Sequence, residues 1–343
     1  RLGLQQMNFG RTHSVHNTSP PPTHKLLKIC VKYVLCAVKC YGFFVFVSFL
    51  LSRLKAVALS YRPPSEARSL IIQVTIGCSH NKCTFCHMYT DKQFRVRKRE
   101  EILADLDECR DTYGPYVQRV FFADGDALVV KTELLLELLH YVKKNFPYAE
   151  RITSYGTAKD VLRKSEEELV ALRKAGLAMI YLGAESGDDE VLVHIQKGET
   201  AAEIIAAGQK LKRCGIQTSV TLISGLGGSA GMEAHAVKSA ELINAMNPEY
   251  ASILTLHLSP ESPMAKEIQR GEMELLKPDQ IMDETELFLT HIDSPGTVFR
   301  TNHASNYLAL AGTFNEDLPR LLREVREARE HSRYRMESWR RRL

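Results

Sequence analysis

The sequence has little of three features that would assign it to a specialised class of protein: a dense set of cysteines, long apolar runs and charge of one sign. Its eight cysteines in 343 residues do not form the framework of a small secreted domain, which favours reducing conditions. The formal net charge of +4 is modest and does not by itself indicate a nucleic-acid partner. With 44% hydrophobic residues, the chain is long enough to bury one large core or two smaller ones.

The apolar stretch at residues 40–51 is too short to be assigned as a membrane span. It has 12 uncharged residues, whereas a spanning helix needs roughly 20. Lysines precede it, as they precede the apolar part of a signal peptide or a short anchor. Two interpretations of residues 29–51 stay open: a membrane anchor, or sequence upstream of the true start. We treat residues 1–56 as an N-terminal extension, disordered and then apolar, and expect a cytoplasmic protein unless 29–51 is an anchor.

A regular alternation of strand-like and helix-like segments begins at residue 57. Strands are expected at 69–77, 119–124, 151–156, 177–185, 216–224 and 250–258. Helices are expected near 99–112, 131–145, 165–175, 200–214, 232–246 and 278–292. A strand followed by a helix, repeated six times, predicts an α/β fold with a parallel sheet and right-handed crossovers. Six units are too few for a closed eight-fold barrel and suit either an open partial barrel or a doubly wound sheet.

Start and stop signals support several of these helices. Ser165 and Glu168 have the spacing of a capping box, and Gly176 and Gly215 stand where two helices would end. Leucines at helical spacing predict a closing helix at about 315–340. The chain therefore divides into the extension, a core at 57–296 and a C-terminal part at 297–343 that contains a strand or loop and the closing helix.

Residues suited to chemistry gather in the segments that follow the predicted strands, which is where parallel sheets bind their ligands. The stretch "CSHNKCTFCHMY" (78–89) follows the first strand, and "ADGDAL" (123–128) follows the second. The fourth and fifth strands lead into "GAESGDDE" (183–190) and "SGLGGSAG" (224–231). Turns favour Gly, Asp and Ser on structural grounds alone. The recurrence of these residues after several strands nevertheless predicts a ligand site at this edge of the sheet.

Cys78, Cys83 and Cys86 have the spacing Cys-x4-Cys-x2-Cys and allow four interpretations. A disulfide leaves one thiol unpaired. Structural zinc needs four ligands, typically from two Cys-x-x-Cys pairs; the sequence has no second pair, although His80 or His87 could supply the fourth ligand. The letters "CTFCH" match a haem-attachment motif but leave Cys78 without a role. A [4Fe–4S] cluster usually takes four cysteines, so three would leave one iron open for chemistry.

The motif around these cysteines resembles that of the radical S-adenosylmethionine (SAM) superfamily. Phe85 precedes the last cysteine, and the motif lies in the loop after the first of six βα units. The resemblance covers about residues 58–260 and implies a (βα)6 partial TIM barrel with a [4Fe–4S] cluster on the three cysteines. It also implies that SAM binds the open iron and that one electron cleaves it to a 5′-deoxyadenosyl radical, which abstracts hydrogen from a substrate. An electron donor such as flavodoxin or ferredoxin is then a partner.

The same resemblance implies SAM-binding roles for residues at the strand ends. The three candidates after the second strand occupy the place of a Gly-Gly-Glu motif that meets the SAM amino group. The two after the fourth strand stand where the family binds ribose hydroxyls, and the two after the fifth where it packs near adenine. The family's commonest spacing is Cys-x3-Cys-x2-Cys, so the additional residue here lengthens the loop. The cofactor-binding candidates are Phe85, Asp124, Gly125, Asp126, Glu185, Ser186, Ile223 and Gly225.

The segment "FRTNHASNY" (299–307) is dense in hydrogen-bonding side chains and has two interpretations of equal weight. In one, the side chains satisfy the local backbone of a strand and turn that close the barrel. In the other, they face a substrate over the open side of the barrel, together with a histidine after the sixth strand. The substrate candidates are His257, Arg300, Asn302, His303, Ser305, Asn306 and Tyr307.

Hypotheses from other functional classes also remain open. One is a non-catalytic metal or electron-transfer protein that holds zinc, a c-type haem or a plain Fe–S centre on the cysteines. Another is a nucleic-acid-binding module built on a Cys/His knuckle, although the sequence gives no strong nucleic-acid signal. The sequence as a whole is loosely similar to oxygen-independent coproporphyrinogen oxidases and to Elongator-type catalytic domains. This similarity does not indicate that the protein acts on the substrate of either group.

Overall fold

The computed structural model describes residues 61–335, and the account below concerns these residues alone. The N-terminal extension at 1–56, with the segment 29–51, lies outside them. By contacts the chain divides into a unit at Arg1–Ala58 and a second unit at Leu59–Leu343, and the second contains everything described here. No helix within residues 61–335 combines the length and the apolar composition needed to cross a bilayer.

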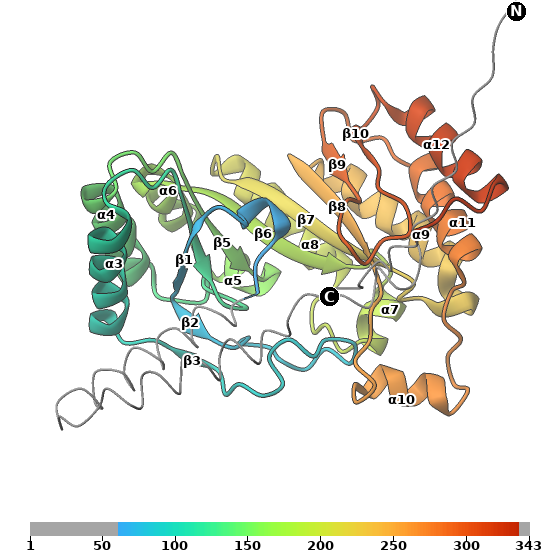
Figure 1. Cartoon of the computed structure of the whole chain (residues 1–343), viewed down its shortest axis with the longest axis horizontal. Coiled ribbons are helices and arrows are strands. Elements are labelled where there is room, and N and C mark those ends of the chain that lie inside the picture. The colour runs from blue at the N-terminus through green and yellow to red at the C-terminus, as the bar shows by residue number, and fades with distance from the viewer. Residues whose placement is uncertain (1–60, 336–343) are drawn as a thin grey trace, which may run out of the picture. The chain divides into compact units, whose positions relative to one another are not determined.

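Eight strands form one sheet in which consecutive strands are neighbours (Figure 1). The strands run parallel from the first to the seventh, and only the last is antiparallel to its neighbour. A doubly wound sheet reverses its order at one point, so this order identifies the open partial barrel of the two predicted alternatives. In order, the strands are β1 (Leu70–Gln73), β4 (Arg119–Ala123), β5 (Arg151–Gly156), β6 (Leu177–Glu185), β7 (Gln217–Ser224), β8 (Tyr250–Thr255), β9 (Val298–Arg300) and β10 (Ala311–Thr313).

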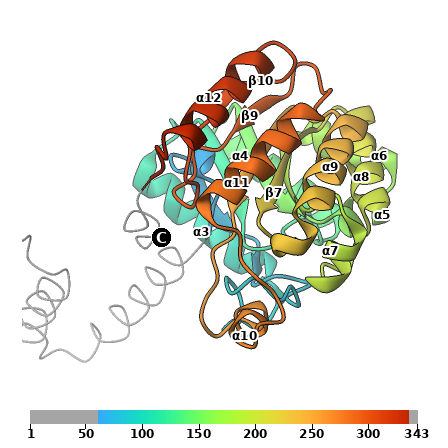
Figure 2. The same cartoon turned by 90° about the vertical axis from the view of Figure 1, so that its right-hand side faces the viewer.

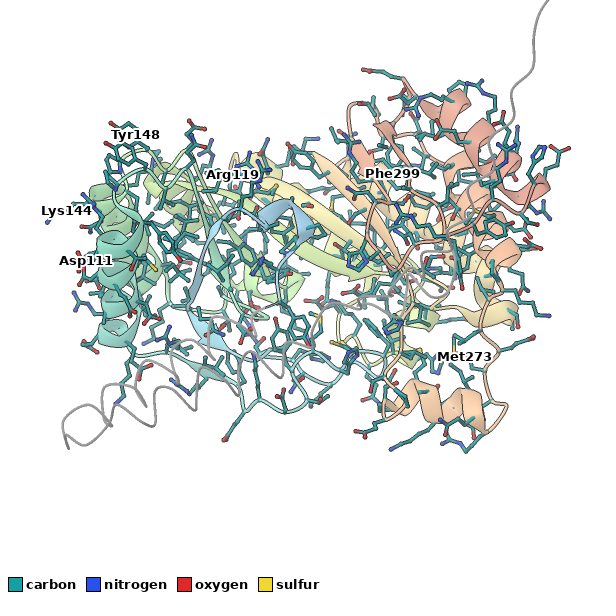
Figure 3. All side chains as sticks on the ribbon, viewed as in Figure 1. Asp111, Arg119, Lys144, Tyr148, Met273 and Phe299 are labelled. Atoms are coloured by element: carbon teal, nitrogen blue, oxygen red, sulfur yellow. The ribbon has the colours of Figure 1, made fainter. Side chains whose placement is uncertain are left out.

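Long helices cover the outer face of this sheet, and Figure 2 shows three of them, α8, α9 and α11, side by side. The large apolar core lies between these helices and the strand residues that point outward, such as Val120 and Phe122. At the far end of the sheet, Phe299 on β9 stacks on Phe314 at 4.7 Å between ring centroids (Figure 3). The long helices are α3 (Arg99–Tyr113), α4 (Thr132–Asn145), α6 (Glu166–Ala175), α8 (Ala201–Arg213), α9 (Gly228–Met246), α11 (Pro278–Thr290) and α12 (Leu318–Glu330).

The predicted helix signals act as expected. Ser165 Oγ accepts a hydrogen bond from Glu168 N at 3.1 Å, and the Glu168 carboxylate accepts one from Ser165 N at 2.7 Å, which completes the capping box. Gly176 and Gly215 follow their helices with φ of 122° and 74°, values that favour glycine. The closing helix is shorter than predicted, because α12 ends at Glu330.

The first predicted strand, 69–77, is two strands. β1 ends at Gln73, and β2 (Thr75–Ile76) leaves the main sheet to pair antiparallel with β3 (Arg95–Val96). The physical reason is that the backbone of β2 bonds to β3 rather than to β4, so the chain separates from the sheet at this point. This two-stranded ribbon carries the cysteine loop, residues 77–94, away from β1 and brings it back toward α3.

A segment before β1, residues 61–69, crosses the inner face of the sheet and is called the strap below. It contains the short helix η1 (Pro64–Glu66) and passes in front of β5 and β6 in Figure 1. Glu66 is fully buried there, 2.5 Å from Arg151 Nη2 of β5. It also accepts a hydrogen bond from the Tyr181 hydroxyl of β6 at 2.5 Å. The strap is therefore anchored on both strands by one buried carboxylate.

Beneath the strap, aromatic rings fill the inner face of the central strands. Phe121 of β4 lies edge-on to Tyr155 of β5 and to Tyr181 of β6, with centroids 5.0 and 5.8 Å apart. Phe121 and Tyr181 belong with Ala123 and Met179 to a small apolar cluster separate from the main core. The inner face is thus closed by side chains over these three strands, as in the filled interior of a full barrel.

We expect Glu66→Ala to lower the free energy of unfolding by about 3 kcal/mol, because it leaves Arg151 and Tyr181 without their buried partner. Urea unfolding followed by circular dichroism measures this loss. Arg68→Ala, at an exposed position of the same strap, is the matched control and should change stability little. A loss below about 0.5 kcal/mol for Glu66→Ala would contradict the anchoring role.

Candidate functional site

The loop after β4 holds the cysteine loop at both of its ends. The Asp124 carboxylate is fully buried, and its Oδ2 accepts a hydrogen bond from Gly77 N at 2.8 Å. Lys92 Nζ, near the other end of the loop, lies 3.3 Å from the same oxygen. One buried carboxylate therefore fixes both ends of the cysteine loop. Hydrogen bonds to a charged group are stronger than those between neutral groups.

Gly125 lets the two loops approach closely. Its N donates to Gly77 O at 3.1 Å. A Cβ atom at this position would lie 2.8 Å from both Cys78 Cβ and Tyr89 Cε2, which is closer than carbon atoms tolerate. The site therefore requires glycine for steric reasons, independently of any contact that Gly125 makes with a ligand.

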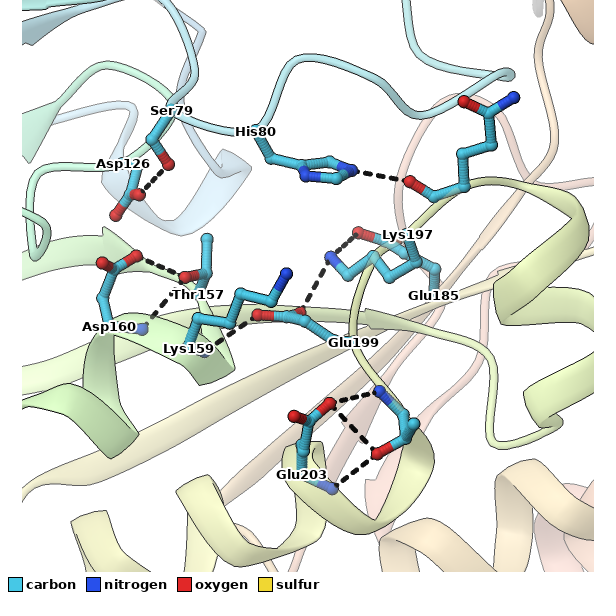
Figure 4. A network of polar contacts seen from close by, with 12 residues as sticks. Ser79, His80, Asp126, Thr157, Lys159, Asp160, Glu185, Lys197, Glu199 and Glu203 are labelled. Atoms are coloured by element: carbon cyan, nitrogen blue, oxygen red, sulfur yellow. Dashed lines mark hydrogen bonds and ion pairs between the residues drawn. The ribbon is translucent and has the colours of Figure 1, made fainter.

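Asp126 is also fully buried and holds the cysteine loop through a hydrogen bond that it accepts from the Ser79 hydroxyl (Figure 4). Burial, together with the neighbouring Asp160 carboxyl, raises the pKa of Asp126 well above its usual range and favours its protonated form. Both Asp124 and Asp126 are thus engaged by protein groups, and their contact with the SAM amino group stays a prediction.

The three cysteines of the loop are free, partly buried thiols. Burial raises the pKa of Cys83 to about 12, with smaller contributions from Cys86 and Cys78, and burial likewise raises the pKa of Cys86. Within residues 61–335, no three His, Cys, Asp or Glu side chains converge as ligands of a single ion would. A [4Fe–4S] cluster takes each thiolate on its own iron, and its binding by these three cysteines stays a prediction.

The middle of the cysteine loop docks on two other loops. Thr84 N donates to Ile195 O at 3.0 Å, just after the short helix α7 (Asp189–His194), and Thr84 O accepts from Met264 N of α10 (Pro263–Gln269) at 3.2 Å. Phe85 is 9% exposed and belongs to the large core. This predicted cofactor contact therefore anchors the loop, and its role toward SAM remains a prediction.

The residue that lengthens the first cysteine gap is accommodated within the loop. Asn81 takes a left-handed backbone conformation, with φ of 43°, and its side chain donates to Tyr89 O at 2.9 Å. Next to it, a ring nitrogen of His80 lies 2.6 Å from Gln196 O, in the loop between α7 and α8 (Figure 4). Within residues 61–335, His80 belongs to no group of three side chains that could hold a single metal ion.

Glu185 ends β6 beside the thiols and forms an ion pair with a lysine that sequence analysis did not single out. Lys197 Nζ lies 3.3 Å from Glu185 Oε1 and 3.8 Å from Glu199 Oε2 (Figure 4). Burial alone would lower the pKa of Lys197, but the two carboxylates raise it overall. The charges of both Lys197 and Glu185 act on Cys83, which places the pair beside this cysteine.

Gly183 makes room for this carboxylate. A Cβ atom on Gly183 would lie only 2.3 Å from Glu185 Oε1, and Glu185 itself has φ of 66°. Lys197 follows a short helix and carries no motif, so only the structure brings it to the site. The one signal in the sequence is its position in a loop at the edge where the strands end.

Ser186 is completely buried and links the ends of β6 and β7 through a histidine. The Ser186 hydroxyl lies 2.8 Å from His235 Nδ1, and His235 Nε2 lies 3.1 Å from Ile223 O. A carbonyl oxygen can only accept, so Nε2 carries the proton and Nδ1 accepts from Ser186. The hydroxyl predicted to meet the ribose of SAM is therefore used inside the protein.

A buried carboxylate on α11 holds the other side of the β7 end. Glu284 Oε2 accepts hydrogen bonds from Gly225 N at 3.0 Å and from the Ser224 hydroxyl. Burial raises the pKa of Glu284 to about 7, against the effect of these two donors. Burial also lowers the pKa of His235 to about 4, so His235 is neutral at pH 7.

Three of the substrate candidates after β9 make contacts within the protein, and their roles toward a substrate stay predictions. Asn306 is buried, donates to Ile253 O at 2.7 Å and accepts from Thr255 Oγ1 at 2.9 Å. Ser305 Oγ accepts from Thr255 N at 3.2 Å, and Tyr307 is buried beside the ring of Tyr334. These side chains close the end of β8, because the β8 backbone at this edge otherwise lacks partners.

The remaining candidates differ in exposure. The Arg300 side chain donates to the carbonyls of Phe299 and Gly312, at 2.6 and 3.2 Å. His303 is half-buried against Ser305, whereas His257 and Asn302 are exposed. Their roles toward a substrate stay predictions.

The opposite pKa shifts of Glu284 and His235 predict how stability depends on pH. Raising the carboxyl pKa from 4.5 to about 7 makes stability fall as pH rises through that window. Lowering the histidine pKa from 6.5 to about 4 makes stability rise with pH between those values. In the native protein the two effects oppose each other in the range where they overlap.

Glu284→Gln removes only the first effect, so the stability of this variant should rise with pH relative to wild type. The expected difference in slope is about 1.4 kcal/mol per pH unit across the overlap. Urea unfolding of both proteins at several pH values measures it. Parallel stability profiles for wild type and variant would show that the Glu284 carboxyl does not titrate as described.

Two curated proteins are similar to this chain over part of its length. The heme chaperone HemW of Bacillus subtilis is 19% identical over 220 residues, which are 64% of this chain and 56% of that protein. A tRNA-2-methylthio-N(6)-dimethylallyladenosine synthase of Bordetella avium is 26% identical over 166 residues, which are 44% of this chain and 33% of that protein. The chain thus spans about half or less of the length of these relatives.

Two solved structures are also similar to part of this chain. Methylornithine synthase, PylB, is 16% identical with a TM-score of 0.48, covering 76% of this chain and 81% of that chain. Coproporphyrinogen III oxidase, HemN, of Escherichia coli is 21% identical with a TM-score of 0.49, covering 65% of this chain and 52% of that chain. At these TM-scores they support no closer assignment.

The family comparison concerns the part of the chain that carries the site. Residues 72–236 match the family model of the Radical SAM superfamily. This range begins in β1, includes the three cysteines and ends in α9, next to His235. This part of the chain, which carries the three thiols, is therefore similar to a Radical SAM domain.

Proposed function

We propose that the protein is a radical SAM enzyme in which Cys78, Cys83 and Cys86 hold the [4Fe–4S] cluster. The observation that carries the proposal is the set of three free thiols on one clamped loop, in a domain whose family binds this cluster and SAM. When bound, the cluster supplies one electron that splits the sulfonium of SAM and yields a 5′-deoxyadenosyl radical. The substrate from which this radical takes hydrogen is not specified by the family.

In this proposal, different residues around the thiols bind different parts of SAM. The Lys197 ammonium, kept charged by Glu185 and Glu199, is a donor for the SAM carboxylate. Glu185 lies next to it as an acceptor for the ribose hydroxyls. The backbone at Ile223 and Gly225 meets the adenine ring, where the positive φ of 91° at Gly225 turns the chain toward α9.

The half-buried position of the thiols suits this chemistry. The raised pKa values of Cys83 and Cys86 mean that cluster assembly must displace protons, which the nearby Lys197 charge favours for Cys83. The apolar residues packed around the loop limit water at the cluster, as reactive intermediates require. Radical SAM enzymes also need a reductant, such as flavodoxin or ferredoxin, and we propose a partner of this kind here.

The curated relatives do not agree on a substrate, since one is named for heme and the other for a tRNA nucleoside. Their similarity supports the shared domain and leaves the substrate open.

We expect Cys83→Ala to abolish SAM cleavage. Anaerobically reconstituted wild type should be brown, contain about four irons and release 5′-deoxyadenosine with dithionite and SAM. The variant should release at least tenfold less, because one iron of the cluster loses its thiolate. Cys109→Ala is the matched control, since Cys109 is a partly buried free thiol on α3, outside the loop. A fully loaded wild-type cluster that yields no 5′-deoxyadenosine would refute the proposal.

Gly125→Ala should impair cluster assembly without changing any ligand. The added methyl group would collide with Cys78 and Tyr89, so the loop must shift away from β4. We expect the iron content after reconstitution to fall at least twofold. Gly231→Ala is the steric control, because a Cβ there meets nothing within 4 Å. Equal iron in both variants would show that the close approach at Gly125 is not needed.

A further inference from the structure

The β7 loop, defined here as Ser224–Gly228, is held from outside the barrel by a distant segment of the chain. Ser224 and Gly225 donate to Glu284 of α11. Just beyond the loop, Ser229 N donates to Glu274 O at 3.0 Å. On the sheet side, Leu256 N donates to Ser224 O at 2.9 Å, and Leu226 is buried in the large core. Residues 274–284 therefore supply the polar contacts that hold the loop from the side of α11.

Glu284 is unusual among these contacts because it is a buried carboxylate that binds two consecutive residues with one oxygen. Its side chain is 4% exposed, and the neutral ring of His235 lies beside it, with Nε2 4.0 Å from Glu284 Oε1. Since His235 Nε2 carries its proton toward Ile223 O, it does not replace the two loop donors. The chief attachment of Glu284 is therefore to Ser224 and Gly225.

His235 extends this attachment to the neighbouring strand. It binds Ile223 O with one ring nitrogen and Ser186 with the other, so the ends of β6 and β7 are fixed at one separation. Ser186 in turn accepts from Asp188 N at 2.9 Å, which holds the start of α7. Glu284 and His235 thus form a buried support beneath the two strand ends that are proposed to bind the ribose and the adenine.

We infer that Glu284 is a positioning residue for SAM: through Ser224 and Gly225 it sets where the β7 loop meets the adenine ring. This inference rests on the proposed function. Glu284 lies behind the loop and touches no ligand, so its effect reaches SAM only through the backbone. An adenine contact is made equally before and during bond cleavage, so its loss raises KM more than it lowers kcat.

The test compares three variants by their affinity for SAM, measured calorimetrically on cluster-loaded protein without reductant. Glu284→Ala should weaken SAM binding about tenfold, because both loop donors lose their acceptor. Glu284→Gln should stay within about threefold of wild type, because the amide oxygen can accept the same two hydrogen bonds. Ser224→Ala, which removes one of the two bonds, should fall between them. Glu286→Gln, on the exposed side of α11 and paired with Arg326, is the control.

A second readout does not depend on SAM. Hydrogen exchange at Gly225–Gly228 in the SAM-free protein should speed up at least tenfold in Glu284→Ala and remain near wild type in Glu284→Gln. If Glu284→Ala does not fold, Ser224→Ala still tests the attachment. In turnover, Glu284→Ala and Ser224→Ala should show a raised KM for SAM with kcat within about twofold of wild type.

The outcomes separate the two proposals. If wild type binds SAM but Glu284→Ala binds it equally well, the positioning role is overturned while the proposed function stands. If Glu284→Gln is as weak as Glu284→Ala, a charge effect replaces positioning by hydrogen bonds, and the inference is also overturned. If cluster-loaded wild type does not bind SAM, the proposed function fails and this inference fails with it.

Discussion

The site depends first on one buried carboxylate, that of Asp124. It holds Gly77 and Lys92, at the two ends of the cysteine loop, while Gly125 beside it allows contact with Cys78. A loop of this length closed only by its own turns would sample many conformations, at an entropic cost for every ordered residue. Because β4 is paired with a strand on each side, its end is a rigid support for the cysteine loop. The positions of the three thiols therefore follow from the packing of two loops.

The remaining groups of the site fall into two sets: those beside the thiols and those that support the ends of the strands. Lys197 and Glu185 lie beside Cys83, whereas His235 and Glu284 lie beneath the strand ends and are almost fully buried. The supporting groups carry the strongly shifted pKa values of about 4 and 7, and both are almost fully buried. Perturbed titration here reflects structural burial, a common alternative to catalysis.

Sequence reasoning was most successful where a local pattern determines the structure. The six strand–helix units were found because periodicity and caps such as Ser165–Glu168 act within a few residues, and the cysteine spacing led to the family. It failed where contacts join distant segments: Lys197 and Glu284 carry no motif, and the burial of Asn306 depends on β8. The break in the first strand was missed because β2 pairs with residues 95–96, a choice no local pattern encodes.

The strap gives the half-barrel two unlike sides. Over β5 and β6 the inner face is sealed by Glu66 and by the rings of Tyr155 and Tyr181. Over β7 and β8 the inward side chains include the hydroxyls of Thr221 and Ser252, 3.3 Å apart and only partly buried. Among residues 61–335, the inner face of the sheet thus has two different parts. The aromatic part over β5 and β6 excludes water, and the part over β7 and β8 has hydroxyl groups that can form hydrogen bonds with a bound molecule.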